Sequence, residues 1–336
     1  MKKITAIFIA LAVAVVAAFI VYDAVQPKPL SSSFFSMNTY CSAEIEAENA
    51  EQVLAETETI VKNLDLEILS RTEKNSVVYN LNKNGESVLD AETAEYFSLL
   101  ADISKQSGGA FDFTLGAVSD LWGFGTEPSV PDKTVLDDAL SHSGHEKVAL
   151  SGNKIILGDK NAVVDFGASG KGIALDSIRS YLENQEVSRA VVSVGGSVLL
   201  CGEDEFTVGI RNPRGDSGST IATLRISEGC ISTSGSYEQH FEAGGKRYHH
   251  ILDPETGYPV DNGLVSVTVI SESGLLSDAL STACFVLGIE KGAELAEYYG
   301  AKAIFITEDN TVYTDEETKS LITISDTNYS MAENPI

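Results

Sequence analysis

The sequence predicts an α+β protein, and three observations support this. Apolar residues are 43% and charged residues 21% of the 336 residues, the composition of a globular chain with room for one large domain or two ordinary ones. Helical and strand periodicities are interspersed, without the regular β-α-β alternation of a doubly wound sheet. No internal repeat, low-complexity tract or clear interdomain linker follows residue 34.

The chain opens with a short basic start and a long apolar run. Lys2 and Lys3 precede 19 residues, from Ile4 to Tyr22, in which only Thr5 is polar. A secretory signal carries roughly 7–15 apolar residues, whereas a membrane-spanning helix needs about 20. We expect residues 1–25 to be an uncleaved transmembrane anchor with the bulk of the chain outside the cytoplasm, followed by a spacer at 26–33. A cleaved signal peptide and a buried core helix are the alternatives.

The remaining elements follow from periodicity and from turn residues. Apolar residues at helical spacing predict helices over 46–69 and 91–106, and Gly108-Gly109 ends the second one. A buried strand is expected at 190–194, and alternation predicts a half-buried strand at 265–269. A helix over 277–287 and strands at 302–307, 311–314 and 321–324 complete the main domain, 34–325. The polar residues 326–336 are expected to form a loose tail.

Charge and cysteine content limit the partners. The 23 Lys and Arg against 49 Asp and Glu give a net charge of -26, so nucleic acid and anionic headgroups should be repelled. An anionic small molecule would need a metal ion or a placed lysine to reverse this field. Cys41, Cys201, Cys230 and Cys284 allow up to two disulfides, but no CxxC motif occurs and buried thiols are favoured.

A glycine-rich turn lies at 165–172, Asp-Phe-Gly-Ala-Ser-Gly-Lys-Gly. It fits neither the Walker pattern nor G-x-G-x-x-G. It does open a helix that runs to about Asn184, so backbone N–H groups and Lys171 would be able to hold an anion there. The alternative is a plain turn with a solvated lysine.

Asp278, Ser281 and Thr282 share one face of the predicted helix over 277–287, because positions i, i+3 and i+4 are neighbours on a helix surface. One carboxylate and two hydroxyls suit Mg²⁺, which completes its shell with waters or substrate phosphates. The alternative for Asp278 is a helix-start residue that interacts with the dipole.

Two further segments carry chemistry-bearing side chains. Tyr248-His249-His250 precedes a tight turn at 253–257, and a histidine there is a base, a ligand or a surface residue. His249 is expected on the surface, pointing away from its neighbour. The aromatic segments 109–114 and 121–125 surround Asp112, as either a cleft for a planar ring or core.

Taken in order, these segments resemble the ApbE family, the FAD:protein FMN transferases. The resemblance covers about residues 34–310 and rests on eight weak motifs in the right order. They are 36–39 (Ser-Met-Asn-Thr), Ser70 with Ser76 and 81–82, 108–114 with 121–125, 165–172, 194–196, 233–235 with Tyr237, 248–260 and 265–288.

The resemblance implies an ApbE-like fold of mixed, largely antiparallel sheets with packed helices. It also implies an activity: cleavage of the FAD pyrophosphate with Mg²⁺, attachment of FMN to a threonine of an extracytoplasmic acceptor protein, and release of AMP. Metal ligands would be Asp278, Thr282, Ser281 and the carbonyl of Ala168, and His250 would be the general base, with Asp278 the second catalytic residue. Flavin contacts would fall on Met37, Thr72, Ala110, Phe111, Asp112, Asp165, Lys171 and the backbone of Leu252.

The sequence departs from the family pattern at four positions. Thr72 stands where an aromatic residue usually faces the flavin, which would weaken ring stacking, and Phe113, Gly170 and Ser197 replace the usual Pro, Ala and Asp. Two other functions stay open. Water would replace the acceptor in an FAD pyrophosphatase, and a flavin-binding protein would hold FAD without turnover.

Overall fold

The computed structural model describes residues 28–336 except 203–204, 217 and 335. The predicted anchor at 1–25 lies outside the described residues. Among the described residues, no helix has the length and apolar character needed to cross a membrane.

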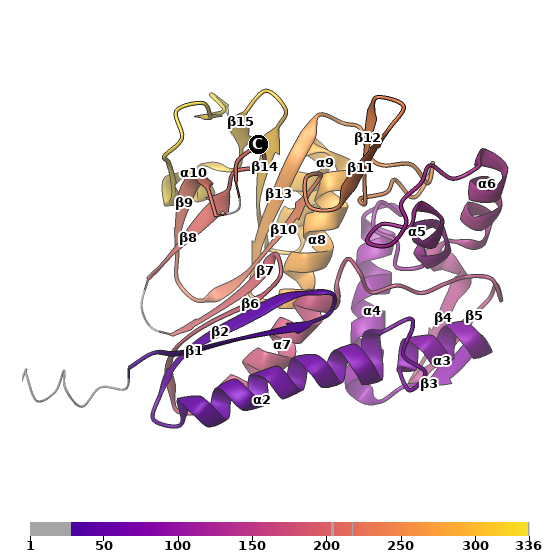
Figure 1. Ribbon diagram of the computed structural model, residues 1–336, viewed down its shortest axis with the longest axis horizontal. Helices are drawn as coiled ribbons and strands as arrows, with labels where there is room; N and C mark the ends of the chain where they lie inside the picture. The colour runs from indigo at the N-terminus through magenta and orange to yellow at the C-terminus, as the bar shows by residue number, and fades with distance from the viewer. Residues whose placement is uncertain (1–27, 203–204, 217, 335) are drawn as a thin grey trace, which may run out of the picture.

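A nine-stranded sheet forms the centre of the molecule (Figure 1). Neighbouring strands run antiparallel except β15 and β17, which are parallel. This arrangement confirms the α+β class. In spatial order its strands are β1 (Leu30–Ser36), β2 (Thr39–Ala47), β6 (Val187–Val194), β7 (Ser197–Gly202), β10 (Gly229–Gly235), β13 (Leu264–Ser271), β14 (Lys302–Thr307), β15 (Thr311–Tyr313) and β17 (Ser330–Met331).

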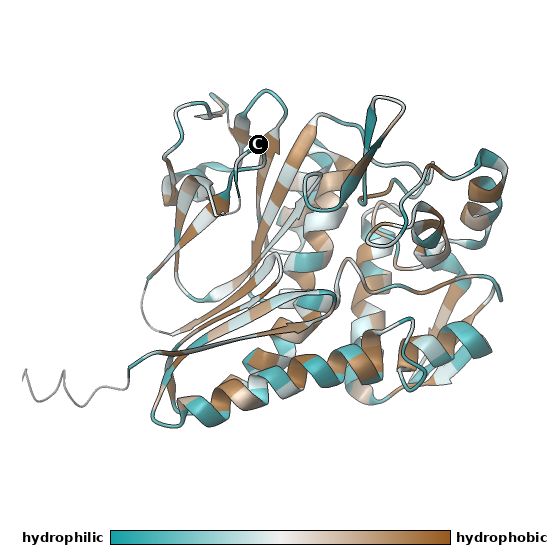
Figure 2. Cartoon of the chain, viewed as in Figure 1, coloured by the Kyte–Doolittle hydropathy of each residue, from teal (hydrophilic) through white to brown (hydrophobic). Residues whose placement is uncertain are grey.

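Helices cover one face of this sheet and a second sheet covers the other. Apolar side chains of α2 and α7 pack on β2 and β6, and α8 packs on β10 and β13. On the opposite face, residues of β8 and β9 pack against β7, β10, β13 and β14. Figure 2 shows α2 with alternating polar and apolar stripes, as expected for a helix with one buried side. These elements are α2 (Ala50–Asn63), α7 (Gly170–Leu182), α8 (Gly274–Leu287), α9 (Ile289–Tyr298), β8 (Phe206–Arg211), β9 (Thr220–Ile226), β16 (Ile322–Ile324) and α10 (Glu316–Leu321).

The two-sided cover corrects the prediction for residues 265–269. That strand is part of β13, and its polar residues Ser266 and Thr268 are 1% and 3% exposed rather than solvated. Thr268 shares a hydrogen bond of 2.8 Å with Thr233 on β10, which satisfies its buried hydroxyl.

A smaller group of elements lies beside α8 and is drawn at the right of Figure 1. The fully buried Trp122 donates from Nε1 to the carbonyl of Gly257 (2.8 Å) and so joins this group to the loop after β12. The group comprises α3 (Val77–Asn84), β3 (Glu86–Val88), α4 (Ala91–Gln106), α5 (Gly116–Trp122), α6 (Lys133–His142), η2 (His145–Lys147), β4 (Val148–Ser151), β5 (Lys154–Leu157), β11 (His240–Ala243) and β12 (Lys246–His249).

Three predicted boundaries change. The helix predicted over 46–69 is α2 followed by a π-helix, η1 (Leu64–Leu69). The spacer at 26–33 overlaps β1, which starts at Leu30 because it pairs with β2. The tail at 326–336 is not loose, since Ser330 and Met331 pair with β15 and Tyr329 is 6% exposed. All four cysteines are free; Cys41, Cys230 and Cys284 are buried as thiols and Cys201 is half-buried.

Candidate active site

The candidate metal residues lie where α7 crosses α8 at very close range. Gly172 and Gly274 form this contact, and a Cβ added to Gly172 would stand 2.1 Å from the carbonyl oxygen of Gly274. The backbone N–H of Gly172 donates to Oδ2 of Asp278 (2.9 Å). The glycine-rich turn and the helix of Asp278, separated by about a hundred residues, therefore meet because neither helix has a side chain at the crossing.

Asp278 is a buried carboxylate, 4% exposed, with remaining capacity to accept. Its Oδ1 accepts from Ser197 Oγ (3.2 Å) and lies 3.9 Å from Nζ of Lys171. A carboxylate offers about four lone-pair sites, and the hydrogen bonds from the N–H of Gly172 and from Ser197 use two of them. Burial of a carboxylate beside a single lysine favours any further positive charge at this position.

Three further hydroxyl groups, two on α8 near Asp278 in the chain and one on β10, are linked to one another by hydrogen bonds. Ser234 on β10 shares hydrogen bonds with Ser281 (2.7 Å) and Thr282 (3.0 Å), and Ser281 Oγ donates to the carbonyl of Asp278 (2.8 Å). Ala168 lies half-buried in the turn before α7. Hard oxygen donors with one charge fit Mg²⁺ that keeps waters or phosphate oxygens in its shell. No group of three or more His, Cys, Asp or Glu side chains gathers at a metal-binding distance in the described part of the chain, so an all-carboxylate cage is absent there.

The two adjacent histidines lie in different environments, and the prediction for His249 is wrong. His249 was predicted on the surface but is buried, because its Nε2 bonds to the carbonyl of Val260 (2.9 Å) and its ring packs against Phe285. His250 is half-buried, with Nδ1 3.3 Å from the carbonyl oxygen of Gln239. Burial and the charge of Lys171 lower the pKa of His250 to about 4. A neutral imidazole near Lys171 is therefore present at neutral pH.

The turn between β1 and β2 forms another side of the site. Met37 is half-buried and packs against two clusters of buried apolar side chains, one around α7 and one around α8. Thr39, the first residue of β2, lies near the loop after β6. A Cβ on Gly195 would lie 2.8 Å from Thr39 Oγ1 and 3.4 Å from Cδ of Lys171. The candidate contacts Met37 and Lys171 thus belong to one neighbourhood.

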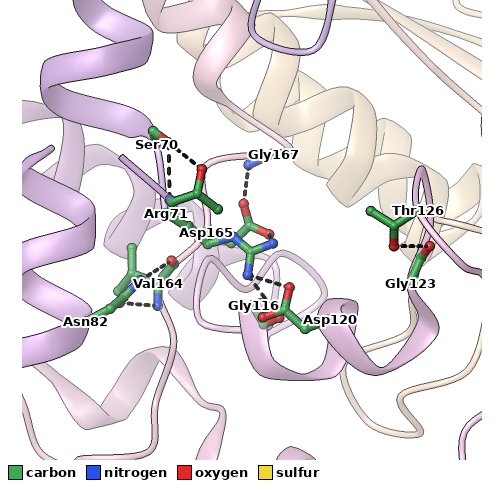
Figure 3. A network of polar contacts seen from close by, with 11 residues as sticks. Ser70, Arg71, Asn82, Gly116, Asp120, Gly123, Thr126, Val164, Asp165 and Gly167 are labelled. Carbon is green, nitrogen blue, oxygen red and sulfur yellow. Dashed lines mark hydrogen bonds and ion pairs between the residues drawn. The ribbon is translucent and has the colours of Figure 1, made fainter. Parts of the chain in front are cut away.

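Asp165 lies in a polar network that Figure 3 shows from close by. Nη2 of Arg71 is 3.3 Å from Oδ2 of Asp165, and Nη1 donates to Asp120 (2.9 Å) and to the carbonyl of Gly116 (3.3 Å). The N–H of Gly167 donates to Asp165 Oδ1 (2.8 Å). Thr72 is exposed one residue after Arg71 and has no aromatic ring to offer.

The loop at 110–112 contributes mainly backbone. Phe111 is 2% exposed and belongs to the core, so its ring is not free to stack on a ligand. Asp112 is half-buried, accepts from Thr114 N (2.8 Å) and Oγ1 (2.7 Å), and has a pKa raised by burial. Leu252 is 8% exposed and bridges to Pro259. Ala110 lines an open groove of about 890 Å³ together with residues 253–256 and 259–262, the end of α8 and one side of α9 from Lys291 to Tyr298.

Several residues of this site were missed by sequence reasoning. Arg71 and Ser234 lie next to or within the motifs at Ser70 and 233–235. The sequence does not identify them as site residues, because a single Arg or Ser has no characteristic spacing. Asp65 and Asp176 lie in predicted amphipathic helices, where a carboxylate is expected on the solvent-exposed face. Only the contacts made across the fold identify them. The assignments of flavin and metal contacts stay predictions.

Comparison with known proteins gives a consistent result. The sequence model of the ApbE family matches residues 37–305. An FAD:protein FMN transferase of Klebsiella pneumoniae is 39% identical over 207 residues, 60% of this chain and 65% of that protein. One of Treponema pallidum is 32% identical over 283 residues, 77% and 78% of the two chains. The crystal structure of the ApbE protein of Thermotoga maritima superposes with a TM-score of 0.79 at 30% identity, covering 88% of this chain and 99% of that one.

Proposed function

The chain belongs to the ApbE family and is an FAD:protein FMN transferase, and we propose that it uses Mg²⁺ to attach FMN to a threonine of an acceptor protein outside the cytoplasm. The observation that carries the proposal is the buried Asp278 at the crossing of α7 and α8, with Lys171 and Ser197 beside its carboxylate. The linked hydroxyls of Ser234, Ser281 and Thr282 lie on β10 and on the helix of Asp278. A chain of net charge -26 repels a diphosphate unless positive charge is placed beside it. Lys171 and a cation bound at Asp278 would supply that positive charge.

Asp278, Thr282, Ser281 and the carbonyl of Ala168 would hold Mg²⁺. The ion supplies charge neutralisation on the pyrophosphate when it is bound. Lys171 adds a fixed positive charge on the same side, 3.9 Å from Asp278. The close contact of Gly172 with Gly274 keeps the lysine and the carboxylate in register, so the substrate phosphates are oriented without rearrangement of the helices.

His250 would act as the general base. Burial and the charge of Lys171 keep its imidazole neutral at neutral pH, so an unprotonated ring nitrogen is available for the proton of the acceptor threonine. The threonine oxygen then forms a bond to the phosphorus on the FMN side, the bond from that phosphorus to the AMP oxygen breaks, and AMP leaves. Met37, Thr72, Asp165, the run 110–112 and the backbone of Leu252 would bind the rest of FAD.

We extend the proposal to the location of the enzyme. The basic and apolar residues 1–25 would anchor the chain in the membrane, with the main domain and its acceptor outside the cytoplasm.

The test is a transfer assay with the purified chain, FAD, Mg²⁺ and an acceptor protein that carries an accessible threonine. We expect acceptor that keeps flavin fluorescence after denaturation, with one AMP released per flavin. Free FMN with unlabelled acceptor would mean that water is the acceptor, and intact bound FAD would mean a binding protein.

The metal is tested by Asp278→Ala and by a chelator. Because the substitution removes the only charged ligand, we expect a loss of about 10²–10³-fold in kcat, comparable to loss of a strong electrostatic stabiliser. The chelator should reproduce this loss in the parent chain and have no further effect on the variant. Full activity of Asp278→Ala would contradict the assignment. Asp315→Ala, a helix cap on α10, serves as the control for removal of a carboxylate.

A further inference from the structure

The turn between β1 and β2 adopts a conformation that its residues disfavour. Met37 and Asn38 have φ angles of 49° and 56°, and Asn310 is the only other non-glycine residue with positive φ in the described part. L side chains enter this left-handed region at a cost, and two-residue hairpin turns of this kind prefer Asn-Gly or Gly-Gly. A strained turn persists where its surroundings fix it, and such positions cluster at functional sites.

One carboxylate fixes this turn. Oδ2 of Asp65 accepts from the backbone N–H of Met37 (2.7 Å) and from Oγ of Ser36 (2.9 Å). Both side-chain hydrogen bonds of Asp65 therefore go to consecutive residues of the turn. Ser36 is 7% exposed and Asp65 is half-buried, so these bonds are partly shielded from competing water.

The backbone at Asp65 is itself unusual. Asp65 lies in the π-helix η1, and the N–H of Ser70 bonds to its carbonyl (3.0 Å), five residues back. A π turn inserted after an α-helix moves the side chains around the helix axis, and such turns are frequent at functional sites. In this protein the π turn directs a carboxylate at the hairpin.

The turn in its fixed position touches two other parts of the site. A Cβ on Gly195 would lie 2.8 Å from Thr39 Oγ1 and 3.4 Å from Cδ of Lys171, and one on Gly125 would lie 3.9 Å from Nδ2 of Asn38. Displacement of the turn would therefore disturb Met37 and the neighbourhood of Lys171 together.

We infer that Asp65 is a positioning residue for FAD: it holds Met37 in the left-handed conformation that presents this residue to the flavin nucleotide. The inference rests on the proposed function and deepens it. Asp65 acts through Met37 and the turn, so its loss should weaken FAD binding far more than it slows the chemical step.

The experiment measures the Kd for FAD by flavin fluorescence, and KM and kcat in the transfer assay, in the full chain. For Asp65→Ala we expect KM and Kd to rise about 10-fold, or 1.4 kcal/mol, with kcat within about two-fold of the parent. Asp65→Asn should restore both constants to within about three-fold, because its amide oxygen accepts the same two hydrogen bonds. Asp102→Ala is the matched control: it removes another half-buried carboxylate, bonded to the hydroxyl of Tyr299 (2.7 Å), and should leave KM unchanged.

A double-mutant cycle tests the route through Met37. Glycine adopts positive φ without strain, so adding Asp65→Ala to Met37→Gly should raise KM less than about three-fold. The inference is overturned if Asp65→Ala leaves KM unchanged in the parent chain. It is also overturned if Asp65→Ala raises KM as much in the Met37→Gly chain as in the parent chain.

If Asp65→Ala does not fold, Ser36→Ala removes only one of the two hydrogen bonds of Asp65. A rise in KM of about three-fold in Ser36→Ala supports the inference, and an unchanged KM overturns it. If the parent chain binds no FAD, the proposed function is overturned together with the inference. If the parent chain binds FAD and Asp65→Ala changes nothing, only the positioning role of Asp65 is overturned.

Discussion

His249 and His250 show how the environment assigns different chemistry to adjacent identical residues. They follow each other at the end of β12, where successive side chains point to opposite sides. His249 is fixed by the carbonyl of Val260 and packs on Phe285, so it is a structural residue. Burial of His250, together with the charge of Lys171, keeps its imidazole neutral. Burial lowers the pKa of both histidines. Both ring nitrogens of His249 have hydrogen-bond partners, the carbonyl of Val260 and the N–H of Ile251, which leaves His250 as the candidate base.

The pH dependence of stability tests this environment. The pKa of His250 is about 4 in the folded chain against about 6.5 in the unfolded chain. Between these values the unfolded chain binds more protons, so the free energy of unfolding falls as the pH decreases from 6.5 to 4. His250→Gln should reduce this fall, measured by urea denaturation at pH 7 and pH 5. An unchanged pH dependence would show that His250 is not buried in its neutral form.

Lys171→Met tests the charge that acts on His250. Without the ammonium group, the pKa of His250 should rise toward its ordinary value, because one of the three causes that lower it, the second largest after burial, is removed. The acid limb of kcat/KM, which reports the free enzyme, should then move to higher pH. If the acid limb of kcat/KM stays at the parental pH, Lys171 does not lower the pKa of the base.

At the scale of elements, the crossing of α7 and α8 decides where the site forms. Besides the glycine contact, Asp176 of α7 accepts from Ser273 Oγ (2.9 Å) and from the N–H groups of Gly274 (2.5 Å) and Leu275 (2.9 Å). A carboxylate at a helix N-terminus satisfies free N–H groups and interacts favourably with the helix dipole. α7 therefore caps α8 and aligns it, which fixes Asp278 relative to Lys171.

Gly172→Ala should disrupt this crossing. The new Cβ would lie 2.1 Å from the carbonyl oxygen of Gly274 and 2.8 Å from Cβ of Asp278, so the helices must separate. We expect a loss of about 1–3 kcal/mol in the free energy of unfolding, together with weaker Mg²⁺ dependence of activity. Gly170→Ala is the control two residues away: its Cβ would meet only Leu69 at 3.4 Å and Phe166 at 3.7 Å. Equal stability of the two variants would contradict the close-contact argument.

At the scale of the molecule, the large sheet separates the site from the C-terminal end of the chain. The helices and the site lie on one face, whereas the second sheet and the C-terminal residues pack on the other. Tyr329 belongs to the core between the two sheets, and its hydroxyl donates to Asn212 (3.0 Å). The final strand β17 completes the edge beside β15.

Truncation after residue 325 should therefore lower stability and leave FAD binding intact. Removal of a buried aromatic side chain costs about 3–5 kcal/mol, and the edge of β15 also loses its partner. We expect a lower Tm by calorimetry with an unchanged Kd for FAD. Removal of residues 333–336 alone should change Tm little, because β17 and Tyr329 remain. A truncated chain with the parental Tm would show that this end contributes nothing to the core.

The match between sequence and structure depends on the range of the interactions involved. Helices α4 and α8 and strands β6, β13 and β14 lie where periodicity predicts them, because local patterning reflects the buried face. The π-helix, the burial of Ser266 and Thr268, and the final strand were missed. Each of these depends on a partner distant in the sequence: the hairpin at Met37, the second sheet and β15.

Residue types and their order are enough to predict the family, the α+β class and the segments that carry the chemistry. Which side chains meet depends on the folding of the whole chain. Gly172 contacts Gly274 and Asp278, Asp65 bonds to the N–H of Met37, and the charge of Lys171 acts on His250. These encounters arise from the packing of elements that lie tens to about a hundred residues apart, and no local periodicity records that packing.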